Sequence, residues 1–164
     1  MAAPNNGRLA RRLRGFWRMP IADKLAIAPV WAAIGLASAA IGVLSFARIA
    51  PAFGESLGAV GLAPLADSRQ TARARFVQRT VLRAAALAPF RADCLPQALV
   101  AVTLCRWLGV ATATHLGVDI ASPAGGAAMK AHAWVEAGPV RVTGGRGVGR
   151  YAIVACFLAA DRLR

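Results

Sequence analysis

Two residues of this chain have the types and the settings that thiol chemistry needs, Cys94 and His132. Cys94 falls in the predicted first turn of a helix, where unpaired backbone N–H groups and the helix dipole favour a thiolate. His132 lies in an alternating segment that predicts a strand, so we expect its imidazole to point away from Ala131 and Ala133, toward the helix that carries Cys94. A cysteine at a helix start that faces a histidine on a strand is the general arrangement of thiol hydrolases.

Spacing alone leaves a plainer interpretation open for each of these residues. A histidine on a strand is more often a satisfied core side chain, and His115, on another predicted strand, is a rival base. Cys105 and Cys156 fall within an apolar helix and an apolar strand, where a cysteine is a small buried hydrophobe. Three widely spaced cysteines make neither a disulfide framework nor a metal knuckle, and no glycine-rich nucleotide-binding motif is present. We therefore expect no metal, no cofactor and a reducing, cytosolic setting.

Helical patterns come first along the chain and strand patterns follow. Apolar residues recur at helical spacing over residues 25–47 and 68–88, and a third helix is predicted from Asp93 to Gly109. The period then changes to two, which predicts strands at 113–118, 131–136, 140–143 and 151–158. The segment 51–67, rich in glycine and proline, is expected to be a loose connection. Helices followed by a small antiparallel sheet predict an α+β fold.

The chain is short, basic and apolar. Its 164 residues suit one domain, and 20 Lys and Arg against 7 Asp and Glu give a formal charge of +13, which favours an anionic partner. An apolar content of 57% excludes a disordered chain. We expect a basic arm over residues 1–18 before a single domain over residues 19–164. Binding of nucleic acid is disfavoured, since no recognised fold signature accompanies the charge.

A stretch of 23 residues without a charge, Leu25 to Ala47, is long enough to cross a bilayer. Its alanine content, Pro29 and one-sided bulky residues favour instead a helix over about residues 21–50 that packs on the domain or lies at a surface. A true span ranks second. A cleaved signal segment, suggested by Ala37-Ser38-Ala39 after a basic start, ranks third. We expect a cytoplasmic protein with peripheral contact to a membrane through this helix and the basic arm.

Three motifs occur together around the candidate pair: Cys94-Leu95-Pro96 at a helix start, a Gly-Val strand, and Ala-His-Ala-Trp-Val-Glu around His132. In their order and spacing over about residues 70–143 they resemble the B2-type proteins of lasso peptide biosynthesis, which belong to the transglutaminase-like, papain-related cysteine hydrolases. The resemblance implies a minimal papain-type core and a leader peptidase that acts on a ribosomally made precursor. It implies Cys94 as the nucleophile and His132 as the general base.

The same resemblance implies three partners. These are the leader of the precursor, a separate leader-recognition protein, and an ATP-dependent cyclase that closes the macrolactam on the freed amine. The separate leader-recognition protein is expected because the chain lacks the leader-binding domain of fused versions. A function from another class stands beside this one: a non-catalytic, basic membrane-peripheral or adaptor protein.

The chain departs from the family at the third catalytic residue. The family has an Asp about a dozen residues after the histidine, where this chain reads Val142-Thr143-Gly144-Gly145. An orienting carboxylate holds the imidazole tautomer, so we expect slow activity, and Gly144→Asp is expected to raise it. Glu136 shares the strand face of His132 but lies about 13 Å away at ~3.3 Å per residue, too far to reach. The other candidates for the orienting group are Thr143, Asp119 and Asp161.

Overall fold

The structure, a computed structural model, describes residues 21–88, 90, 92–120, 130–145 and 147–160 and has the predicted α+β order. The basic arm expected over residues 1–18 lies outside the described residues. The helices are α2 (Ile21–Val43), α3 (Phe46–Ile49), α4 (Ser68–Leu87) and α5 (Cys94–Trp107), with 3-10 turns η1 (Ala50–Phe53) and η2 (Val148–Arg150). The strands are β1 (Glu55–Gly58), β2 (Thr112–Asp119), β3 (Ala131–Ala137), β4 (Val140–Thr143) and β5 (Tyr151–Ala159).

The strands form one antiparallel sheet in the order β1-β5-β2-β3-β4. Four of them lie where alternation predicts strands. The fifth, β1, lies within the segment 51–67, so the prediction of a loose connection is wrong there. Its four residues are mostly exposed and follow no alternating pattern, and only pairing with β5 makes them a strand. A sheet edge defined by its partner leaves no local signal in the sequence.

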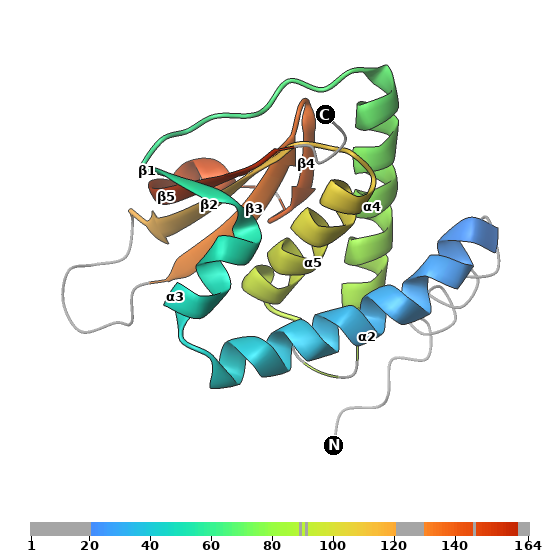
Figure 1. Cartoon of the computed structure of the whole chain (residues 1–164). Helices are drawn as coiled ribbons and strands as arrows, with labels where there is room; N and C mark the ends of the chain where they lie inside the picture. The colour runs from blue at the N-terminus through green and yellow to red at the C-terminus, as the bar shows by residue number, and fades with distance from the viewer. Residues whose placement is uncertain (1–20, 89, 91, 121–129, 146, 161–164) are drawn as a thin grey trace.

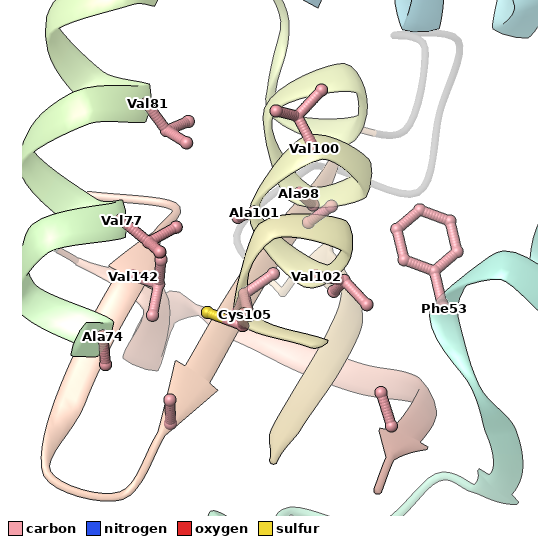
Figure 2. Close-up of a cluster of buried hydrophobic side chains, with 14 of the residues drawn as sticks. Phe53, Ala74, Val77, Val81, Ala98, Val100, Ala101, Val102, Cys105 and Val142 are labelled. Carbon is pink, nitrogen blue, oxygen red and sulfur yellow. The ribbon is translucent and has the colours of Figure 1, made fainter. Parts of the chain in front are cut away.

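Helices α4 and α5 pack on one face of the sheet and enclose the core (Figure 1). Figure 2 shows Val77 of α4 beside Val142 of β4, with Cys105 of α5 in the same cluster. Asp67 caps α4 by accepting a hydrogen bond of 2.7 Å from the Gln70 N–H. This packing holds α5 against β3, so that the first turn of the helix lies near the start of that strand.

The predicted packing of the apolar helix on the domain is confirmed. One face of α2 is buried against α4 and α5, through Ile27, Val30, Ile34 and Ala37. The helix is shorter than expected: it ends at Val43, and residues 46–49 form the separate helix α3 because Ser45 takes an extended conformation (φ −64°, ψ 149°). Within the described residues, one helical stretch, Leu25–Val43, is long and apolar enough to cross a membrane, and 22% of it is buried in the protein.

Candidate active site

The structure brings Cys94 and His132 to one site. Cys94 is the first residue of α5 and His132 the second of β3, and both are half-buried. They line two cavities together, one of about 670 Å³ and one of about 280 Å³. Within the described part of the chain no hydrogen bond joins the thiol to the imidazole. The thiol and the imidazole therefore line the same cavities without a hydrogen bond between them.

The imidazole of His132 rests on an aromatic platform. Its ring stacks on Tyr151 at 5.0 Å and on Trp134 at 6.2 Å between centroids. Gly117 lies opposite His132 in the sheet, and a Cβ there would be 2.8 Å from the Tyr151 Cβ, so the platform requires glycine. Ala133, on the other face of β3, belongs to the core that packs on α5. His132 thus lies with Trp134 and Tyr151 and also lines the two cavities that Cys94 lines.

A backbone carbonyl orients the imidazole. The Nε2 atom of His132 lies 2.8 Å from the carbonyl oxygen of Gly144. Because a carbonyl only accepts hydrogen bonds, Nε2 carries the proton and donates it, and the neutral ring keeps the Nδ1 lone pair for a base. Gly144 follows His132 by twelve residues, the spacing at which an acid was expected. A neutral acceptor fixes the tautomer, as in the Cys-His-Asn arrangement of papain-like proteases, but adds no negative charge.

The side chain at position 144 cannot take over this role. Gly144 has φ +95°, and a Cβ there would lie 2.2 Å from the Cβ and 3.0 Å from the Cα of Trp134. The expectation that Gly144→Asp raises activity is therefore wrong, because the new side chain collides with a neighbouring strand. No signal in the sequence distinguishes Gly144 from the other glycines of this segment, since the collision depends on the pairing of β3 with β4.

None of the other candidates for the orienting group is hydrogen-bonded to His132 among the described residues. Asp119 forms an ion pair with Arg150. Glu136 forms one with Arg141 at 3.1 Å. The Thr143 hydroxyl is buried and has no hydrogen-bond partner among the described residues. Asp161 lies outside the described residues. The Gly144 carbonyl is thus the group that orients His132.

The remaining cysteines are buried, as their apolar surroundings predict. Cys105 and Cys156 are both 0% exposed. Burial raises the pKa of Cys105 to about 12, and burial likewise raises the pKa of Cys156. Both thiols therefore stay protonated and are poor nucleophiles. Groups of three or more metal-binding side chains do not occur among the described residues.

His115, the rival base, lies away from Cys94. It is 1% exposed, stacks on Trp134 at 5.2 Å and lines neither of the cavities that Cys94 lines. The Leu62 N–H donates to its Nε2 over 3.4 Å, so the neutral ring carries its proton on Nδ1. His115 is thus a core histidine of the sheet face that also carries His132.

The burial of His115 predicts a loss of stability in acid. Burial lowers the pKa of His115 below its ordinary value of 6.5. The unfolded chain therefore binds this proton more readily, so the stabilisation is complete above pH 6.5 and declines as the pH falls below that value. In urea unfolding at several pH values, the His115→Gln variant is expected to lose less of its free energy of unfolding on acidification than the wild type. An equally steep loss in both proteins would contradict this assignment.

A cysteine at the first turn of a helix, packed on an antiparallel sheet beside a strand histidine, is the architecture of the thiol hydrolases. The chain belongs to the transglutaminase-like superfamily, whose family model matches residues 40–156. This superfamily is related to cysteine proteases and has a papain-like fold. The match spans Cys94, His132 and Gly144 and begins within α2. Comparisons with curated proteins and with solved structures returned no match.

Proposed function

We propose that this protein is a cysteine peptidase of lasso peptide biosynthesis, which removes the leader from a ribosomally made precursor. The observation that carries the proposal is the lining of one site by Cys94 and His132, with the Gly144 carbonyl holding the imidazole in the tautomer of a base. Membership of the transglutaminase-like superfamily supports a thiol-dependent reaction. The resemblance of the three motifs to B2-type proteins supports the leader as the substrate.

In this reaction the Nδ1 atom of His132 takes the proton of the Cys94 thiol, and the sulfur attacks the carbonyl carbon of the scissile bond. The new S–C bond gives a tetrahedral intermediate. The imidazolium then returns the proton to the leaving amine as the C–N bond breaks, which leaves a thioester on Cys94. Water, activated by the same imidazole, hydrolyses the thioester and frees the leader. Substrate binding brings Nδ1 and Sγ to hydrogen-bond distance, a contact that often tightens only in the complex.

The start of α5 supplies donors for the oxyanion. The N-cap Asp93 makes no side-chain capping hydrogen bond to the helix, and Pro96 has no N–H group. The backbone N–H groups of Cys94 and Leu95 are therefore available at the first turn, where the helix dipole also favours negative charge. Two such donors stabilise the oxyanion of the tetrahedral intermediate.

The proposed partners are the precursor leader, a separate leader-recognition protein and an ATP-dependent lasso cyclase, in the cytoplasm. The test incubates the chain with the precursor encoded beside its gene, with and without the neighbouring leader-binding protein, and follows both fragments by mass spectrometry. We expect leader and core peptide to appear together, faster when the leader-binding protein is present. Intact precursor under every condition, with a folded protein, would overturn the proposal.

A second candidate, peripheral attachment to an anionic membrane, is favoured by the outer face of α2. Four large apolar residues of α2 are 73–85% exposed, although the helix packs on α4 and α5: Ile21, Leu25, Leu36 and Val43. The spacings of 11 and 7 residues between the last three are close to whole helical turns, so they form one apolar stripe. A stripe of this kind beside a chain of formal charge +13 suits the surface of an anionic bilayer.

The double variant Leu25→Asp with Leu36→Asp is expected to weaken binding to vesicles of phosphatidylcholine and phosphatidylglycerol about tenfold or more. Each leucine contributes about 1.5–3 kcal/mol when buried in an apolar environment. Co-sedimentation measures the affinity, and Val60→Asp with Leu65→Asp is the control, because both are exposed and lie outside the stripe. Equal binding by both variants would contradict the assignment. Retention in native membranes through carbonate extraction would instead show a true span.

A further inference from the structure

The two cavities that share Cys94 and His132 differ in chemistry. The smaller, of about 280 Å³, is lined apart from this pair only by apolar side chains and a glycine. The larger, of about 670 Å³, includes Asp93, Gln97 and the backbone of Gly144 and Gly145. A peptide bond placed at the thiol would therefore have an apolar recess on one side and a polar one on the other.

The apolar recess is built by elements from distant parts of the chain. Its walls are Phe46 of α3, Leu95 of α5, Leu116 and Val118 of β2 and Val154 of β5. The ring of Phe46 packs edge-on against Phe157 at 6.2 Å between centroids, which holds it over the recess. Because 280 Å³ is just below the range of pockets that take whole small molecules, the recess has the size for one large side chain.

The chemistry of the reaction distinguishes the two sides. After acylation the amine half of the substrate leaves and water must enter. The imidazole of His132 takes part in both steps, and it is oriented by its hydrogen bond to Gly144. Gly144 lines the larger, polar cavity. The half that stays bound to the Cys94 sulfur needs a place that holds it while water arrives. An apolar recess lined by Cys94 itself supplies that place.

We propose that the smaller cavity is the specificity pocket for the acyl side of the scissile bond, and that it selects a branched aliphatic or aromatic side chain next to that bond. This assignment rests on the proposed peptidase function. One methylene group more or less in an apolar pocket changes the rate about 10–200-fold. A substrate with a charged side chain at this position is expected to react more slowly still, since burial leaves its charge unpaired.

The test uses N-acetylated amino-acid vinyl sulfones that differ only in the side chain next to the reactive group: Gly, Leu, Phe, Lys and Asp. The Cys94 sulfur adds to the vinyl carbon remote from the sulfone, a proton from solvent ends on the carbon beside it, and no leaving group is released. Intact-protein mass spectrometry gives the rate of adduct formation. We expect the Leu and Phe probes to react about tenfold or more faster than the Gly probe, and the Lys and Asp probes to be slowest.

Val154 and Val60 provide a matched pair of variants. Both are valines of similar exposure, 51% and 47%, but only Val154 lines the recess. Val154→Asp is expected to slow the Leu probe about tenfold and to reduce its advantage over the Lys probe. Val60→Asp is expected to leave the order and the rates unchanged. Phe46→Ala removes the aromatic wall of the recess that packs against Phe157. This variant is expected to narrow the difference in reaction rate between the Phe and Gly probes.

Iodoacetamide tests the reactivity of the Cys94 thiol independently of the pocket, because it is too small to need the recess. If Cys94 reacts quickly with iodoacetamide while all vinyl sulfones react at one rate, or Val154→Asp changes nothing, the pocket assignment is wrong and the peptidase proposal stands. If Cys94 reacts with every reagent no faster than free cysteine does, the nucleophile is wrong, and both proposals are overturned.

Discussion

Cys94→Ala is expected to abolish leader release, lowering the rate about 10³-fold or more while the protein remains folded. The sulfur is the atom that forms the acyl-enzyme, and no other thiol of the chain can replace it. Cys105 and Cys156 are 0% exposed, and burial raises the pKa of each. Initial rates from chromatography, with circular dichroism as the check on folding, measure the effect.

Cys105→Ala is the matched control, because it removes a thiol from the same helix at a buried position. It is expected to reduce stability modestly and to leave the turnover of the folded protein unchanged. His132→Ala is expected to slow release to a similar extent as Cys94→Ala, and the double variant to be no slower than either single one, since nucleophile and base act as a unit. Turnover that survives in Cys94→Ala would refute the assignment of the nucleophile.

Gly144→Ala is expected to lower the free energy of unfolding by about 3 kcal/mol or more. A Cβ at this position would lie 2.2 Å from the Cβ of Trp134, and φ +95° is a conformation that side chains disfavour. For a chain of this size the melting temperature would fall by roughly 6–12 °C. The strand must also shift to relieve the collision, and that shift moves the Gly144 carbonyl away from His132. Thermal unfolding and the rate of leader release both report the change.

Gly145 is the matched control for Gly144. It also has a positive φ, +65°, but a Cβ there meets nothing within 4 Å. Gly145→Ala should therefore cost only the conformational strain, about 1–2 kcal/mol. Equal losses of the free energy of unfolding in Gly144→Ala and Gly145→Ala would show that contact with Trp134 is not the reason why position 144 requires glycine.

The same comparison shows where a carboxylate can be added. Gly145 lines the larger cavity together with His132, and Asp tolerates its left-handed backbone better than most residues do. A carboxylate in that cavity stabilises the imidazolium, so Gly145→Asp is expected to raise the rate about tenfold, or about 1.4 kcal/mol of transition-state stabilisation. An unchanged rate in a folded Gly145→Asp variant would mean that the backbone carbonyl already suffices.

Local patterns in the sequence determine much of this protein. The switch from helical to alternating periodicity predicts the α+β order, and the residues around Cys94 predict the start of α5 at that position. Capping and periodicity depend on residues within one or two turns of each other, so they can be recognised without the rest of the chain. The burial of Cys105 and Cys156 follows in the same way from their apolar surroundings.

The pairing of distant segments decides the rest. Three features depend on which strands are neighbours and in which register they pair. They are the strand β1, the face of the sheet on which His132 lies, and the hydrogen bond from the His132 ring to Gly144. The alternation around His132 is compatible with either face of the sheet. A carbonyl oxygen, moreover, is present at every residue, so its use as the orienting group leaves no trace in the amino-acid types. The sequence by itself determined the thiol and the imidazole, and the tertiary structure decided what surrounds and orients them.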